Sequence, residues 1–406
     1  MSAFAEPRRD GATGDRLARR NALVLAIAQA LAGGNNTVIV STGGIVGSML
    51  APDRAFATLP ISVMVLGMWI GTLPVGMLSK AYGRRFALQV GSLIGAVSGL
   101  ISCWAVLHAS FGLFLLGAFG SGLYAAAHQS YRFAAADTAS DAFKPKAVSW
   151  VLAGGVFAGI LGPQLVIFTK DVWQPYLFAA TFIGQAGFAL LTAFVLILVK
   201  IPRPVAVQGA KRGRPLAEIA RTPRFITAVL CGVASYAMMN LVMTSAPLAM
   251  VDCGHSVTTA TLGLQWHVLA MYGPSFFTGS IIARFGMDRV ILSGLALIGV
   301  AAAIGISGIS VAHFWTALIL LGIGWNFAFI GATTMVTRCH RPEERNQVQA
   351  FNDFLIFGSM AIGSFASGTL LATFGWSAVN EVVFPAILAA AVLLIWLSVR
   401  ERTKLA

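Results

Sequence analysis

Twelve apolar segments separated by short polar loops leave this chain few ways to fold. A helix needs about 20 apolar residues to cross the hydrocarbon core of a bilayer, and each segment meets that length. Only 11% of the residues are charged, whereas a soluble domain usually has about 25%. We therefore expect an all-α polytopic membrane protein. The predicted spans are 21–49, 57–79, 86–108, 111–136, 147–169, 174–199, 225–251, 258–283, 289–310, 313–336, 346–373 and 377–399.

The basic residues, which give a net charge of +13, gather in alternate loops. Residues 80–85 hold three of them and residues 200–224 hold seven, whereas the loops on the other side hold only Arg54 and Lys170. Cytoplasmic loops of membrane proteins are enriched in Lys and Arg. We therefore predict that both termini are cytoplasmic and that the charge reports topology, with no nucleic-acid partner. The first twenty residues hold five arginines without an apolar core, so we expect a tail and no signal peptide.

The chain divides into two similar halves. The segment Gly76–Gly83 recurs as Gly279–Gly286, at an offset of 203 residues. Residues 200–224 form the only long polar connection between apolar segments. Two six-span repeats with a substrate site between them are typical of secondary transporters. The predicted organisation is a cytoplasmic tail (1–20), a six-helix bundle (21–199), a cytoplasmic linker (200–224), a second six-helix bundle (225–399) and a second tail (400–406).

Two consecutive spans each carry a pair of soft or borderline metal ligands, Met239 with Met243 and His267 with Met271. A spacing of four places both members of a pair on one face of a helix. At 1.5 Å per residue, all four lie roughly 16–26 Å from the inner ends of their helices. Thioether and neutral imidazole groups suit Cu(I). The pattern indicates either a copper site or methionines that fill helix contacts.

Two further pairs of side chains extend or qualify this interpretation. The repeat maps the span-eight pair onto Met64 and Met68, which either face the same cavity or match by coincidence. Cys231 and Cys253 flank the span-seven pair, about 33 Å apart along one helix, which is too far for a disulfide.

Ionisable groups are rare inside spans and are candidates for function. Asp353 is a candidate for proton coupling, or else pairs with an inner-loop arginine. His128 either relays protons or is a hydrogen-bonded structural residue. The run Gly33–Asn36 either opens its helix and supplies amide ligands or makes a close helix contact.

The loop between the second and third spans resembles the inner-loop signature of the major facilitator superfamily. Its residues run Gly76-x-Leu78-x-Lys80-x-x-Gly83-Arg84-Arg85, and the position that is usually Asp is Ser79 here. The Met239/Met243 and His267/Met271 motifs are similar to those of copper importers of the CcoA type, a bacterial branch of the superfamily. That branch also has thiols where Cys231 and Cys253 lie. The run Gly154–Pro163 partly resembles an element of drug/proton antiporters, although a tightly packed helix gives the same pattern.

The resemblance implies an alternating-access carrier that imports copper across the bacterial cytoplasmic membrane for assembly of haem–copper cytochrome c oxidase. Copper would be the cargo, with no prosthetic group and no enzymatic activity. The expected partners are the copper ion, the lipid bilayer and a cytoplasmic copper chaperone, and the expected state is a monomer. The alternative is a secondary carrier of a small organic molecule, such as riboflavin, or a drug/proton antiporter. His267 would then donate a hydrogen bond and the methionines would form an apolar wall.

Overall fold

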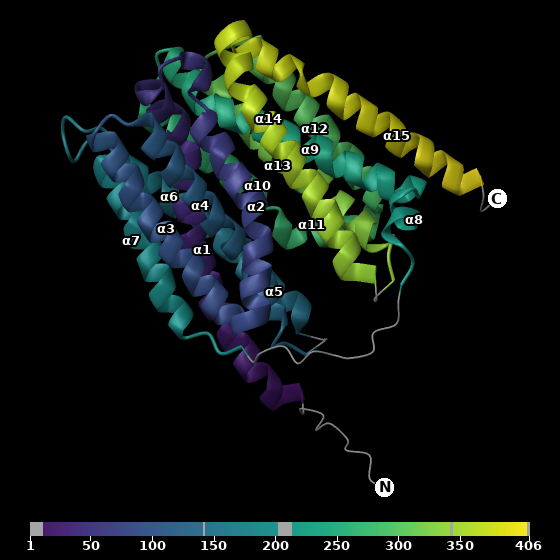
Figure 1. Ribbon diagram of the computed structural model, residues 1–406. Helices are drawn as coiled ribbons and strands as arrows, with labels where there is room; N and C mark the ends of the chain where they lie inside the picture. Colours follow the sequence, from purple (N-terminus) through teal and green to yellow (C-terminus); the bar gives the residue numbers. More distant parts are fainter. Residues whose placement is uncertain (1–10, 141–142, 202–212, 342–343, 404–406) are drawn as a thin grey trace.

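A computed structural model describes residues 11–140, 143–201, 213–341 and 344–403, and within these ranges the regular structure is helical throughout (Figure 1). The helices form a first group, α1–α7, and a second group, α9–α15, which lie side by side in Figure 1. Their bounds are α1 Gly11–Leu50, η1 Arg54–Phe56, α2 Leu59–Tyr82, α3 Arg84–Leu107, α4 Phe111–Gln129, α5 Tyr131–Ala136, α6 Lys144–Thr169, α7 Ala179–Ile197, α8 Leu216–Ala220, α9 Pro223–Asp252, α10 Val257–Tyr272, α11 Ser275–Phe285, α12 Met287–Ser307, α13 Val311–Thr337, α14 Arg345–Glu381 and α15 Val383–Thr403.

Ten stretches of the described chain are long and apolar enough to cross a membrane. The predicted span 258–283 is not among them, because it is divided between α10 and α11, each too short alone. Residues 347–403, which hold two predicted spans, form one continuous stretch with a kink at Gly375, where φ is 79°. The all-helical membrane fold is confirmed, and the count of twelve crossings stays a prediction.

The break between α10 and α11 falls at Pro274, which has no N–H to continue the helical hydrogen bonds. Asn326 of α13 bonds the groups on both sides of it. Its Nδ2 donates to the carbonyl oxygen of Met271 (2.6 Å) and to Ser275 Oγ (2.7 Å), and its Oδ1 accepts from Thr278 Oγ1 (2.6 Å). Backbone groups freed inside a membrane must find such partners, so Asn326 is what makes the break stable.

Glycines set the closest approach between α1 and α6. A Cβ atom at Gly154 would lie 2.3 Å from the carbonyl oxygen of Ala26, and one at Gly162 would lie 2.6 Å from that of Gly34. The helix α1 runs unbroken through Gly33–Asn36, and Asn35 Nδ2 donates to the carbonyl oxygen of Gln185 on α7 (2.8 Å). Both glycine-rich runs are therefore helix contacts.

The sequence repeat corresponds to a repeated backbone conformation. Gly83, between α2 and α3, has φ 91° and ψ 155°, and Gly286, between α11 and α12, has φ 84° and ψ 150°. The two positions differ by 286 − 83 = 203 residues, the offset of the repeat. Positive φ is cheap only for glycine, which explains why both copies carry it.

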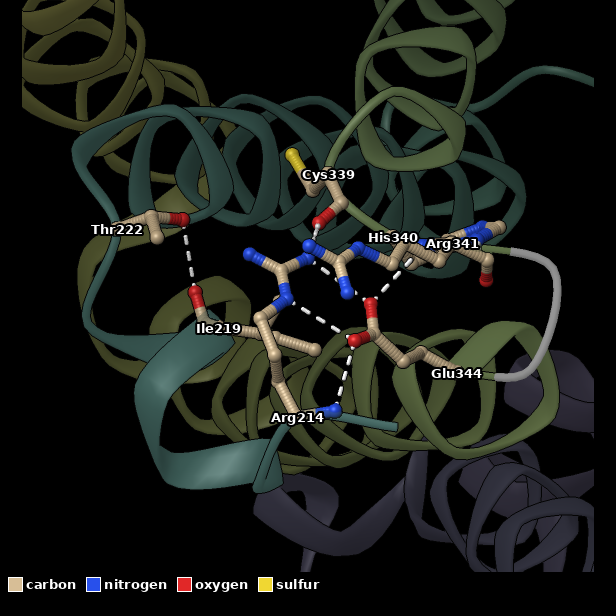
Figure 2. Close-up of polar contacts among 7 residues, drawn as sticks. All are labelled: Arg214, Ile219, Thr222, Cys339, His340, Arg341 and Glu344. Carbon is tan, nitrogen blue, oxygen red and sulfur yellow. Dashed lines mark hydrogen bonds and ion pairs between the residues drawn. The ribbon is translucent and has the colours of Figure 1, made fainter. Parts of the chain in front are cut away.

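The segment before α8 is bound to the loop between α13 and α14 (Figure 2). The buried carboxylate of Glu344 accepts from Arg214 Nε and Nη2 (both 2.9 Å) and from the backbone N–H groups of Arg214 and Arg341 (2.8 and 2.9 Å). Arg214 Nη2 also donates to the carbonyl oxygen of Cys339 (3.2 Å). The pKa of Glu344 is held below its ordinary value mainly by the hydrogen bonds from the Arg214 side chain. This contact fixes the end of the linker to the second helical group.

Candidate substrate cavity

A cavity of about 710 Å³ lies between the two helical groups. Helices α2, α4 and α5, with the start of α3, form the wall from the first group, and α14 forms the wall from the second. We call the end of the molecule where α7 ends and α8 begins the linker side. The cavity residues are Trp69, Ile70, Thr72, Leu73, Val75, Gly76, Ser79, Arg84, Ala126, Gln129, Ser130, Arg132, Phe133, Ala350, Asp353, Phe354 and Phe357.

Aromatic rings from both groups meet at this cavity. Trp69 of α2 and Phe354 of α14 have ring centroids 5.0 Å apart at 47°. Phe354 is 53% exposed, although it lies in a spanning helix and lines the cavity. Phe357, one turn further along α14, also lines the cavity and contacts Tyr236 edge-on (centroids 6.2 Å). Flat aromatic ligands gain both buried area and ring contacts from such walls.

Two opposite charges face this aromatic space from different groups. Arg132, in α5, has its guanidinium carbon 4.8 Å from the centroid of Phe133, and its buried Nε has no hydrogen-bond partner among the described residues. Asp353, in α14, accepts from Asn352 Nδ2 (3.2 Å) and is within electrostatic reach of Arg132. The cavity thus has a guanidinium group on one wall and a carboxylate on the other.

The third charged cavity residue, Arg84, is engaged at the linker side. It forms an ion pair with Asp137, which follows α5. The loop signature that contains Arg84 has Ser79 in place of its usual acidic residue. Asp137 is therefore the carboxylate that Arg84 binds, and the pair joins the start of α3 to the end of α5.

The two helical groups touch directly on the side away from the linker. Helices α2 and α14 are joined by Ser62 Oγ and Ser364 Oγ (2.9 Å) and by Ser367 Oγ, which donates to Thr58 Oγ1 (3.4 Å). Helices α6 and α10 are joined by Gln164 Nε2, which donates to Gln265 Oε1 (2.8 Å). An ion pair between Arg54 and Asp252 adds a contact outside the spans. The cavity therefore lies on the linker side of a closed contact.

The residues predicted to bind copper lie away from this cavity. In α10, His267 is fully buried, and its Nδ1 is 2.6 Å from the carbonyl oxygen of Leu318 on α13. Its Nε2 is buried without a hydrogen-bond partner among the described residues. Met239 and Met271 belong to the buried apolar cluster of the second group, and Met243 packs against it. None of these four side chains is among the residues that line the cavity.

The span-two pair is likewise a packing element. Met64 and Met68 are buried in α2, and a Cβ atom at Gly122 of α4 would lie 2.0 Å from the Met64 carbonyl oxygen. The pair is absent from the residues that line the cavity in this conformation, and its role as a transfer site stays a prediction. Both side chains belong to a buried apolar cluster that also contains Leu264, Val268 and Met360 of the second group.

The remaining predicted residues are also separate from one another. Cys231 Sγ lies 3.8 Å from the carbonyl oxygen of Ala390, and Cys253 follows α9 at its far end. His128 of α4 is buried between Tyr124 and Tyr131, with both ring centroids at 6.2 Å. Among the described His, Cys, Asp and Glu side chains, no group of three could hold a metal ion.

Two helical groups around a shared cavity are typical of secondary transporters. The chain belongs to the Major Facilitator Superfamily, whose sequence model matches residues 25–274 and 228–406. The superfamily prediction is thereby confirmed.

Among proteins with assigned names, the chain is 50% identical over 372 residues to the riboflavin transporter RfnT of Brucella anthropi, covering 91% of this chain and 93% of that protein. It is 30% identical over 376 residues to the uncharacterized transporter YdeG of Bacillus subtilis, covering 88% and 86%. Two solved structures share the fold. A mutant of the nucleoside transporter NupG matches with a TM-score of 0.67 at 13% identity, covering 92% of this chain and 98% of that one. A bacterial homologue of the lysosomal transporter Spinster matches with a TM-score of 0.66 at 16% identity, covering 93% and 95%.

The prediction of copper import for cytochrome oxidase assembly is wrong. A relative with half of its residues identical over nearly the whole chain is a riboflavin transporter, and the copper-importing branch finds no support in these comparisons. Each four-residue pair lies within one helix, Met239 and Met243 in α9 and His267 and Met271 in α10. His267 contacts Leu318 inside the second group, whereas Met243 packs both against the cluster of the second group and against the cluster that contains Met64 and Met68.

The aromatic residues that line the cavity were not predicted from the sequence. Trp69, Phe354 and Phe357 lie in apolar spans, where an aromatic residue gives the same pattern whether it faces lipid or a cavity. Arg132 carried a usable signal, because an arginine within an apolar segment is costly unless it serves a site. The structure places Arg132 on the cavity wall.

Proposed function

We propose that the protein is a secondary carrier that moves riboflavin, or a flavin of the same uncharged tricyclic class, across the bacterial cytoplasmic membrane. One observation carries this proposal, the 50% identity to a riboflavin transporter over 91% of the chain. Identity at this level and coverage exceeds what the fold alone requires, since the two solved transporters named above have the same fold with only 13% and 16% identity to this chain.

The chemistry of the cavity supports a flavin. Its volume of about 710 Å³ is within the usual range of about 300–1,000 Å³ for small-molecule sites. The isoalloxazine ring is flat and aromatic, which suits the walls formed by Trp69, Phe354 and Phe357. The ring carbonyls need donors, which Gln129 and Arg132 supply, and the ribityl hydroxyls need acceptors, which Asp353 supplies.

Transport requires the two helical groups to close their contact alternately on one side of the cavity and on the other. With the termini in the cytoplasm, as the distribution of basic residues favours, the linker side is cytoplasmic and this conformation is open inward. Opening the far side requires the contacts of Ser62, Gln164 and Arg54 with the second group to separate. We propose Asp353 as the group that couples this exchange to protons, because it is a carboxylate on the cavity wall.

Uptake of radiolabelled riboflavin by a bacterial strain without its own flavin transporter tests the proposal. Cells that express the protein should accumulate riboflavin, and Trp69→Ala should reduce uptake about tenfold, since one aromatic contact contributes about 0.5–1.5 kcal/mol beyond buried area. Trp266→Ala is the matched control, because Trp266 is a 44% exposed tryptophan of α10 outside the cavity. Uptake equal to that of cells with empty vector would refute the proposed function.

A further inference from the structure

The charges that line the cavity cancel. Among its described lining residues, Arg84, Arg132 and Asp353 carry charge. Arg84 is held by Asp137 at the linker side. What remains for a ligand is one cation from the first helical group and one carboxylate from the second. A ligand between them therefore meets no net charge.

The two charges lie on opposite walls with aromatic rings between them. Arg132 is held over Phe133, and its Nε lacks a hydrogen-bond partner among the described residues. Asp353 is one residue from Phe354, whose ring contacts Trp69. A flat ligand that stacks on these rings would place its polar edges toward the guanidinium and the carboxylate.

We infer that the cavity selects flavins by charge, taking the uncharged molecule and rejecting its 5′-phosphate ester, with Asp353 as the residue that determines this selectivity. The inference rests on the proposed function, since it concerns which flavin the same cavity takes. A phosphate ester carries about −1.5 to −2 charges at neutral pH. In a partly dehydrated cavity it would lose its hydration and meet the repulsion of Asp353. Arg132 alone would attract it, and Asp353 offsets that attraction.

Equilibrium binding tests the inference without requiring transport, which matters because Asp353 is also the proposed coupling group. The purified full-length protein is titrated with riboflavin, whose fluorescence is quenched when its ring stacks on aromatic side chains. The same titration with flavin mononucleotide, which carries the same fluorescent ring, then gives the relative affinity of the two flavins. We expect the mononucleotide to bind at least about tenfold more weakly to the wild type.

The variants separate charge from other effects. Asp353→Asn should reduce the ratio of riboflavin affinity to mononucleotide affinity about tenfold, because the charge of Arg132 is then unopposed. Arg132→Gln should increase this ratio. Asp171→Asn should behave as wild type, since Asp171 pairs with Lys170 on the surface, outside the cavity. Should Asp353→Asn fail to fold, the Arg132→Gln result decides.

The outcomes distinguish the inference from the function on which it rests. Wild-type protein that binds both flavins equally would overturn the selectivity and leave riboflavin transport intact. An affinity ratio that neither Asp353→Asn nor Arg132→Gln changes would overturn the role of Asp353 in selectivity. Wild-type protein that binds no riboflavin would overturn the proposed function itself.

Discussion

Replacing Asn326 with alanine removes the hydrogen bonds that join the two sides of the break between α10 and α11. Asn326 is fully buried and makes three of them, to Met271, Ser275 and Thr278, all at 2.6–2.7 Å. Hydrogen bonds between transmembrane helices contribute on average about 0.6 kcal/mol each, and at most about 1.7. Three short ones therefore contribute about 2–3 kcal/mol to the free energy of unfolding. At the usual entropy of unfolding per residue, that corresponds to a fall of about 2–4 °C in Tm.

Thermal unfolding of the purified protein in detergent, followed by near-UV circular dichroism, measures this effect. Asn240→Ala is the matched control, because Asn240 is also a buried asparagine of a spanning helix but makes one bond, to the carbonyl oxygen of Met360 at 3.4 Å. Its Tm should fall by no more than about a third as much. Equal shifts in the two variants would refute the reasoning, since both would then reflect the loss of side-chain volume alone.

Two further predictions concern the linker and the packing of α2 on α4. Because Arg214 holds the pKa of Glu344 down, this pair stabilises the protein above the ordinary carboxyl pKa and the contribution is lost as pH falls through the lowered value. Glu344→Gln should thus flatten the acid limb of a Tm-against-pH curve, and an unchanged acid limb would contradict the assignment. Gly122→Ala places a Cβ atom 2.0 Å from the Met64 carbonyl oxygen and should destabilise by about 1–3 kcal/mol, whereas Gly112→Ala meets nothing within 4 Å and should be neutral. Chemical denaturation of both variants checks this, and similar midpoints would show that α2 moves aside freely.

The membrane fold could be predicted because hydropathy reports directly on transfer into hydrocarbon. Helices are also the only spanning structure that satisfies its own backbone there, apart from closed barrels. The break at Pro274 was not predicted, because the apolar pattern continues across it and its stability depends on Asn326, which lies about 50 residues later in another helix. Hydropathy therefore identifies which segments lie in the membrane, whereas contacts with residues distant in the sequence determine where a helix breaks.

The candidate site was harder to predict for a geometric reason. Four-residue spacing shows which side chains share a helix face but not which neighbour that face meets. The face of α10 that bears His267 meets Leu318 of α13, not the cavity. The face of α14 that bears Asp353 and Phe354 meets the cavity. Asp353, which was predicted as a coupling group because a carboxylate is too costly to face lipid, lines the cavity, and its coupling role stays a prediction.

The nature of the closed contact is consistent with a carrier that must reopen it. Hydroxyl groups join α2 to α14 in two pairs, Ser62 with Ser364 and Ser367 with Thr58, and two glutamines join α6 to α10. Such uncharged bonds contribute about 0.6 kcal/mol each inside a membrane, and an exposed ion pair such as Arg54 with Asp252 adds at most about 1 kcal/mol. Each group can be rehydrated when the contact separates, so no charge is left buried and unpaired. A ligand that binds the two conformations with moderately different affinity can therefore shift the equilibrium between them.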